Sequence, residues 1–322
     1  MMITSEYLVF GATEGTGYAF SSLLMDKQIP FTIFAEDLNK VPAVFKTSKF
    51  INVIEGRTDD PPLMEKTLND RQYVFLGNDY TLSEWKEQAI NLFRSIITAV
   101  TSGRPTLIYP GTVLQFAGGM PVTERAAPRP ACRRGILEVK LEDILLEAVV
   151  EKKCKVMIMR FPELYGPGVV KTDISAVFSA VARGKRSSYP VNIDSPRQFA
   201  YSEDAAEVTF RVLKQHDKDF FSVFNYAGNT YSSVRSFIKQ IQEQAGLKQN
   251  IKVHSKRKIR LLSFFSHTWR EKNERKHFFE QSFLIDDSRS RKLVPDFEPT
   301  ASTEAIANTL HWFRSSGNRF NA

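Results

Sequence analysis

The stretch that decides the fold is YLVFGATEGTG, residues 7–17. Four apolar residues lead into three glycines, and a segment with the apolar spacing of a helix follows them. Backbone N–H groups and a helix N-terminus can face a pyrophosphate in such a turn, and glycine is needed where a Cβ would block the approach. We therefore predict a dinucleotide site here, and the alternative is a glycine-rich turn without a ligand. The candidate residues are Gly11, Thr13, Glu14, Gly15, Thr16 and Gly17.

The residue that follows the next predicted strand bears on the identity of the dinucleotide. Glu36 comes directly after the apolar run 31–34, where a carboxylate can accept hydrogen bonds from both ribose hydroxyls and repels a 2′-phosphate. This favours NAD over NADP, unless Glu36 only ends a turn in solvent.

Strands and helices alternate over about the first half of the chain. Predicted strands continue at 50–54, 73–76, 106–109 and 156–159, with helices at 83–102 and 134–152. This order is typical of an α/β, Rossmann-like, doubly wound parallel sheet. We predict that residues 1–168 and about 197–229 form an NAD-binding domain, with a helix at 202–215 and a strand at 222–225. Residues 169–196 and 230–322 would form a smaller C-terminal substrate-binding lobe, with helices at 232–245 and 303–313 and a strand at 283–285.

Composition limits the class of protein. The chain has 322 residues, of which 42% are hydrophobic and 25% charged, and this excludes disordered, collagen-like and coiled-coil proteins. Two cysteines are too few for a disulfide framework, so we expect a reducing, cytoplasmic location. The sequence shows neither a signal peptide nor a long apolar segment, and we expect no membrane partner. The five histidines lack the spacing of metal ligands, and we expect no metal.

A basic segment carries most of the net charge of +8. Between Lys252 and Lys276 lie nine Lys or Arg and two Glu, and Phe264, Phe265 and Trp269 are interspersed among them. Such a segment can hold phosphates or stack on bases. A solvated face, or a lobe that covers an anionic sugar nucleotide, is the simpler interpretation, so a nucleic-acid partner is not our first expectation.

The chain resembles the extended branch of the short-chain dehydrogenase/reductase superfamily, which is epimerase- and dehydratase-like. The resemblance rests on the glycine turn, on RFPELYGPG at 160–168 and on RQFAYSED at 197–204. It implies hydride transfer on a nucleotide sugar or a small hydroxy or keto compound, within an epimerisation as one option, and a homodimer as one option for assembly. A non-catalytic NAD(P)-binding sensor or scaffold, and an RNA-binding member of the family, are the alternatives.

The catalytic residues of this superfamily are a Ser or Thr, a Tyr and a Lys, with the Tyr four residues before the Lys on one helix. The resemblance aligns the Lys with Lys140, the Tyr with Ile136 and the Ser with Pro110, and Thr112 lies two residues further on. Two of the three groups are therefore replaced, as in an atypical subgroup that lacks the catalytic Tyr.

The resemblance also bears on the cofactor pocket. Relatives often carry an Asp that contacts adenine after the third strand, where this chain has Arg57. Arg57 could stack on adenine or reach a phosphate, which leaves room for NADP. Gly77 and Asn78 follow the fourth strand and keep the small residue that lets the backbone lie against the cofactor.

The remaining groups give the catalytic candidates. Glu163 takes the place of an Asn that relatives carry beside the substrate, and a partly desolvated carboxyl group there could act as an acid or a base. The alternative for Glu163 is an orienting or structural carboxylate. Our catalytic candidates are Lys140, Glu163 and Thr112, and Lys140 is also a candidate for binding the nicotinamide ribose.

Overall fold

The computed structural model describes residues 5–77, 82–101, 103–116, 118, 121–216 and 219–315, without the side chains of residues 82–86. Its contacts divide the chain into two compact units. Unit 1 comprises Met1–Gly111, Leu137–Arg160 and Ala206–Phe224. Unit 2 comprises Thr112–Ile136, Phe161–Ala205 and Asn225–Ala322.

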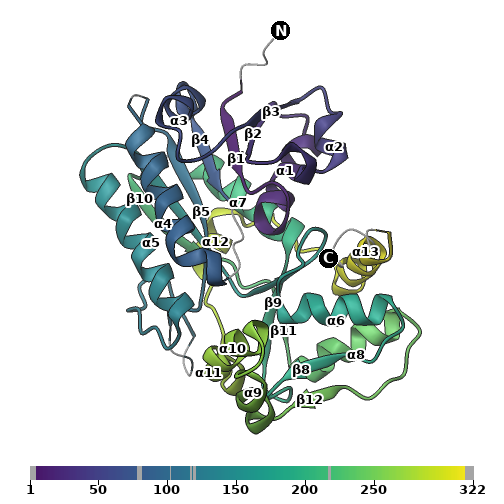
Figure 1. Ribbon diagram of the computed structural model, residues 1–322. Coiled ribbons are helices and arrows are strands. Elements are labelled where there is room, and N and C mark those ends of the chain that lie inside the picture. The colour runs from purple at the N-terminus through teal and green to yellow at the C-terminus, as the bar shows by residue number, and fades with distance from the viewer. Residues whose placement is uncertain are drawn as a thin grey trace. The chain divides into compact units, whose positions relative to one another are not determined.

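Unit 1 is built on a seven-stranded sheet with the order β10-β6-β5-β4-β1-β2-β3 (Figure 1). The four strand pairs from β5 to β3 are all parallel. The strands are β1 (Tyr7–Phe10), β2 (Phe31–Ala35), β3 (Ile51–Glu55), β4 (Tyr73–Leu76), β5 (Thr106–Thr112), β6 (Lys155–Phe161) and β10 (Phe221–Asn225). The helices are α1 (Gly15–Asp26), η1 (Leu38–Lys40), α2 (Ala43–Lys46), α3 (Pro61–Leu68), α4 (Leu82–Ala99), α5 (Arg133–Val150) and α7 (Ser202–Gln215).

Strand β1 shows why helices cover both faces of this sheet. Its side chains alternate, so Leu8 and Phe10 join the buried cluster with the apolar stripes of α3, α4 and α5. Tyr7 points to the opposite face, where its ring lies 6.3 Å from Phe20 of α1 and 6.4 Å from Phe210 of α7. A strand that is apolar on both faces belongs in a covered parallel sheet. The predicted Rossmann-like α/β fold is therefore confirmed.

Unit 2 contains two small sheets, with the orders β11-β9-β7 and β12-β8. Its strands are β7 (Glu163–Tyr165), β8 (Ser188–Pro190), β9 (Arg197–Tyr201), β11 (Asn229–Tyr231) and β12 (Lys252–His254). Its helices are α6 (Asp173–Ala182), α8 (Val234–Gln244), α9 (Lys256–Leu262), α10 (His267–Glu274), α11 (Lys276–Glu280), α12 (Ser288–Leu293) and α13 (Ser302–Ser315). An aromatic core holds α6, α8 and α13 against the three-stranded sheet, and Phe237 stacks on Phe199 at 4.7 Å.

The unit boundaries differ from the predicted domain boundaries. Residues 112–136, 161–168, 197–205 and 225–229 make their contacts in unit 2, whereas the sequence placed all of them with the cofactor domain. They begin at the ends of strands of the large sheet or lead into it, and they include the first turns of α5 and α7. The NAD-binding and substrate-binding roles of the two parts remain predictions.

The predicted strand at 283–285 is wrong. Phe283 and Ile285 each form an isolated bridge, to Arg197 and to Val122 respectively. The side chain of Gln198 takes the place of a continuing ladder, because its Oε1 accepts the N–H of Ile285 at 2.6 Å and its Nε2 donates to the carbonyl of Ile285 at 3.3 Å. None of the helices in the described ranges is long and apolar enough to cross a membrane.

Candidate functional site

The glycine turn joins β1 to α1 in unit 1. Gly11 and Gly15 have φ values of +73° and +61°, a region that residues with a Cβ rarely adopt. A Cβ on Gly17 would lie 2.3 Å from the carbonyl oxygen of Gly11. The turn therefore needs glycine at all three positions, twice for backbone conformation and once for the close approach of helix and strand.

Gly77 closes the turn from the end of β4. Its N–H donates to the carbonyl of Phe10 at 3.1 Å, and a Cβ on it would lie 2.6 Å from the Cα of Gly17. The backbones of β1, α1 and β4 thus meet without side chains between them. Asn78 lies outside the described residues.

The first turn of α1 has no acidic residue, and the side chain of Glu14 at the N-cap does not cap the helix. Thr13, Glu14 and Thr16 are half-buried around this end of the helix. A helix N-terminus of this kind favours an anion, because its first N–H groups have no partner within the helix and the helix dipole is positive there. The turn fits the pyrophosphate of a dinucleotide.

Glu36 and Arg57 lie at the ends of neighbouring strands. Glu36 is exposed directly after β2, and the hydroxyl of Thr58 donates to its carboxylate at 3.5 Å. The guanidinium of Arg57 forms a bidentate pair with Asp59, with distances of 2.8 Å and 2.6 Å. The carboxylate of Glu36 is therefore accessible to the hydroxyls of a ribose. Arg57 would have to break its ion pair with Asp59 before it could contact adenine or a phosphate.

The face of helix α5 that packs on the sheet does not contain Ile136 and Lys140, the two positions that the resemblance assigned to the active site. Ile136 and Lys140 are both exposed, because the apolar stripe through Leu137 and Leu141 faces the sheet. Glu138, beside this stripe, is fully buried and accepts a hydrogen bond of 2.6 Å from the hydroxyl of Tyr109 on β5. The predicted roles of Lys140 stay predictions, and the structure adds a buried carboxyl group that sequence analysis missed.

Two further groups lie near the ends of β5 and β6. The hydroxyl oxygen of Thr112 accepts the N–H of Leu114 at 3.2 Å, so it holds the turn after β5, and its predicted catalytic role stays a prediction. Arg160 forms a bidentate pair with Glu142 of α5, at 3.1 Å and 2.7 Å. Glu138 and Glu142 stand one helical turn apart, so α5 presents a row of carboxylates to the sheet rather than a Tyr and a Lys.

Glu163 begins β7 in unit 2, and both of its carboxylate oxygens are engaged. One accepts the N–H of Ile174 at 2.7 Å, and the other accepts the hydroxyl of Tyr189 at 2.9 Å. Burial raises the pKa of Glu163, and the negative charge of Asp173 raises it further. Glu163 thus ties α6 and β8 to β7. Its predicted role as a proton carrier stays a prediction.

Asp173 binds part of the basic segment. Its carboxylate lies 2.9 Å from Nζ of Lys272 and 3.2 Å from Nη2 of Arg275. Burial alone would raise the pKa of Asp173, but these two cations outweigh burial and lower it. At least two of the nine cations of the basic segment therefore serve the interior of unit 2 rather than a solvated face.

Arg197 is a buried cation in the same unit, with 1% of its surface exposed. Its Nη2 donates to the carbonyls of Phe278 and Gln281, at 2.8 Å and 3.2 Å, and its guanidinium lies 4.6 Å from the centre of the Phe278 ring. Its Nε and Nη1 have no partner among the described residues.

In the part of the chain that the structure describes, no three His, Cys, Asp or Glu side chains are grouped closely enough to hold a metal ion.

Residues 7–227 match the model of the NAD dependent epimerase/dehydratase family. The chain belongs to this family. The membership confirms the predicted superfamily and supports NAD as the cofactor. No curated protein sequence matches the chain.

Solved structures of the same fold are numerous. MoeE5 in complex with UDP-glucose and NAD is 18% identical over 98% of this chain and 100% of its own, with a TM-score of 0.76. A UDP-N-acetylglucosamine 4-epimerase from Methanobrevibacter ruminantium M1, in complex with UDP-N-acetylmuramic acid, is 17% identical over 98% and 100%, with a TM-score of 0.77. A UDP-glucose 4-epimerase from Bifidobacterium longum, in complex with NAD+ and UDP, is 17% identical over 98% and 99%, also with a TM-score of 0.77. At these identities the similarity establishes the fold.

Proposed function

We propose that this protein binds NAD in the glycine turn and transfers a hydride to and from a nucleotide sugar or a small hydroxy or keto compound. The observation that carries the proposal is the contact of three backbones at Gly11, Gly17 and Gly77, beside the N-terminus of α1, whose first N–H groups favour an anion such as a pyrophosphate. Family membership supports NAD, and so does the exposed carboxylate of Glu36 at the end of β2.

A nucleotide sugar is the substrate class that the comparisons and unit 2 favour. Similar structures were solved with UDP-glucose, UDP-N-acetylmuramic acid or UDP. Arg197 adds a buried cation with two nitrogens, Nε and Nη1, that lack a partner in the described ranges, and such donors favour an anionic ligand. A nucleoside diphosphate would supply that anion.

A non-catalytic NAD sensor or scaffold is the second candidate. It is favoured by α5, whose sequence RRGILEVKLEDILLEAVV contains no Tyr to transfer a proton. Loss of general acid–base assistance is typically worth about 10² to 10⁴ in rate. We therefore expect any turnover of common epimerase substrates to be slow unless another group carries the proton.

The first test concerns cofactor choice. Purified protein is expected to bind NADH at least about tenfold more tightly than NADPH in a fluorescence titration, because Glu36 repels a 2′-phosphate. Glu36→Gln should narrow the difference, mainly by improving NADPH binding. Glu65→Gln, at an exposed position of α3, is the matched control and should change neither affinity. Equal affinities in the wild type would remove the role given to Glu36.

The second test concerns chemistry. Stopped-flow absorbance should detect hydride transfer when the enzyme with saturating NAD meets a panel of UDP- and dTDP-sugars. Glu163→Gln keeps the side-chain volume but removes the ionisable group. We expect it to slow turnover by about 10² or more, with NADH affinity within about twofold of the wild type. Turnover that this variant leaves unchanged would take Glu163 out of the mechanism. Firm NAD binding without turnover on any sugar would favour the sensor.

A further inference from the structure

Unit 2 exposes a compact apolar surface at the turn between α9 and α10. Leu261, Phe264 and Phe265 are 61%, 70% and 82% exposed. Single exposed apolar residues are common on proteins, but three within five residues form a contiguous patch, and such patches mark interaction sites. We call residues 257–265 the α9–α10 tip.

The exposure of these side chains follows from an ordered backbone. The N–H groups of Phe264, Phe265 and Ser266 donate to carbonyls of the last turn of α9, at 3.3, 3.0 and 3.1 Å. Ile259, with 1% of its surface exposed, anchors the opposite side of α9 in the interior. In addition, the His254 ring lies 4.9 Å from the Trp269 ring, between β12 and α10. The tip is therefore held with its apolar face outward.

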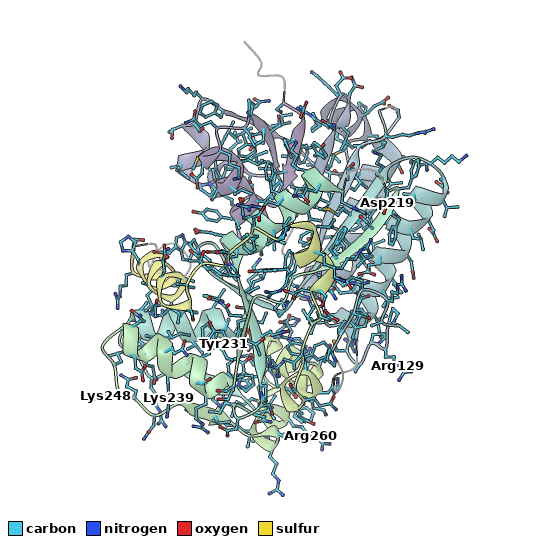
Figure 2. All side chains as sticks on the ribbon, turned by 180° about the vertical axis from the view of Figure 1, so that it is seen from behind. Arg129, Asp219, Tyr231, Lys239, Lys248 and Arg260 are labelled. Carbon is cyan, nitrogen blue, oxygen red and sulfur yellow. The ribbon has the colours of Figure 1, made fainter. Side chains whose placement is uncertain are left out.

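Cations surround this apolar face. Residues 252–270 contain six Lys or Arg and no Asp or Glu. Lys256 pairs with Glu280 at 2.9 Å, but Arg257, Lys258 and Arg260 are exposed and have no carboxylate within ion-pair distance in the described ranges. Figure 2 shows Arg260 extending away from the ribbon at this end of the unit. These cations contrast with Lys272 and Arg275, which bind Asp173 in the interior.

We propose that the α9–α10 tip docks on an anionic lipid bilayer. Phe264, Phe265 and Leu261 enter the boundary between headgroups and acyl chains, and the flanking cations attract the lipid phosphates. Apolar side chains on one face with Lys and Arg beside them are typical of interfacial segments. The expectation of no membrane partner rested on the lack of a spanning segment, and docking at the surface needs none.

The apolar composition favours lipid over nucleic acid. Phe264 and Phe265 could stack on bases or enter acyl chains, since aromatic rings serve both purposes. Leu261 has no π face for stacking, yet it is 61% exposed beside the rings, and its aliphatic side chain adds to insertion in a bilayer. A lipid complex therefore gives a role to all three side chains, whereas a nucleic-acid complex gives one only to the two aromatic rings.

Vesicle flotation with the full chain tests the proposal. Protein should float with vesicles of phosphatidylcholine and phosphatidylglycerol at least about tenfold more than with phosphatidylcholine alone, and high salt should reduce the difference. The double variant Phe264→Ala/Phe265→Ala and the charge variant Arg257→Glu/Lys258→Glu should each lose about tenfold or more of this binding. Phe220→Ala, which removes a 51% exposed phenylalanine from unit 1, is the matched control and should bind as the wild type does.

NADH titration of all three variants shows whether each one is folded, and we expect unchanged affinity. Equal flotation with both kinds of vesicle, or wild-type flotation of the tip variants, would overturn the proposal. So would single-stranded RNA binding in place of vesicle binding, if the same variants lost it, because the tip would then be a nucleic-acid surface. A self-association that the phenylalanine variant abolishes, without vesicle binding, would assign the tip to a second copy of the chain.

Discussion

Asp173→Asn is expected to lower the free energy of unfolding of unit 2 by about 3 kcal/mol. Asp173 is buried and binds both Lys272 and Arg275, whose side chains are only 20% and 19% exposed. An amide keeps the volume but removes the charge, so two largely desolvated cations lose their partner. Breaking a buried pair in this way costs far more than the pair contributes relative to apolar residues, because the remaining charge is left uncompensated.

The pH dependence of stability gives the same prediction a second readout. The pKa of Asp173 is lowered in the folded chain, since its two cations outweigh burial. The contribution of ionised Asp173 to the free energy of unfolding is therefore complete above its unfolded pKa of about 3.9, and it is lost as the pH falls through the lower folded pKa. Glu163 behaves in the opposite way, because burial and Asp173 raise its pKa. The contribution of protonated Glu163 to the free energy of unfolding is complete below its unfolded pKa of about 4.3, and it is lost as the pH rises through the raised folded pKa.

Urea unfolding followed by tryptophan fluorescence measures both effects, since Trp269 and Trp312 lie in unit 2. The wild type should lose stability in acid through the titration of Asp173, and Asp173→Asn should lack that loss. Asp194→Asn is the matched control in the same unit, because it breaks the exposed pair with Arg235 and should cost no more than about 0.5 kcal/mol. If the two variants are equally stable, the Asp173 cluster contributes no more than a surface pair.

The fold of unit 1 could be predicted because its signals are local. Each central strand is a short apolar run, and the glycines after the first strand mark a turn where backbones approach closely. The alternation of strands and helices then predicts a parallel sheet covered by helices on both faces. Unit 2 offers weaker signals, because its strands are three to five residues long and its basic helices α9 to α11 have no clear apolar period.

The orientation of α5 could not be read from sequence alone. Ile136 and Lys140 have the spacing of a shared helical face, but so has any pair four residues apart. The stripe of Leu137, Leu141 and Leu145 decides which side faces the sheet, and it leaves Ile136 and Lys140 exposed. The sequence did contain one signal that Glu138 is buried, namely its position beside this leucine stripe. Its hydrogen-bond partner Tyr109, however, lies on a strand 29 residues away.

The charge cluster of unit 2 was beyond sequence analysis for a related reason. Asp173 meets Lys272 and Arg275 across about 100 residues of chain, and no periodicity links them. The sequence therefore showed one basic segment, whereas the structure separates cations that bind Asp173 from cations that surround the α9–α10 tip. Charge count alone does not distinguish a cation that stabilises the interior from one that is available to a partner.

Gly15→Val is expected to reduce NADH affinity by about 100-fold or more, because it acts where the proposed pyrophosphate approaches the first turn of α1. Gly15 begins α1 with a φ of +61°, and a β-branched side chain there strains the backbone as well as narrowing the approach. Loss of affinity alone could therefore reflect loss of structure.

Gly246→Val separates these two causes. Gly246 follows α8 in unit 2 with a φ of +70°, and a Cβ there meets no atom within 4 Å. A valine at position 246 would strain the backbone by about 1–3 kcal/mol, as a valine at position 15 would, but position 246 is remote in sequence from the glycine turn. Urea midpoints and NADH fluorescence titrations on both variants should show comparable losses of stability and a loss of affinity in Gly15→Val only. If Gly15→Val still binds NADH, the cofactor does not use this turn. If both variants lose NADH, the loss at Gly15 reflects general destabilisation, and the glycine turn gains no support as the cofactor site.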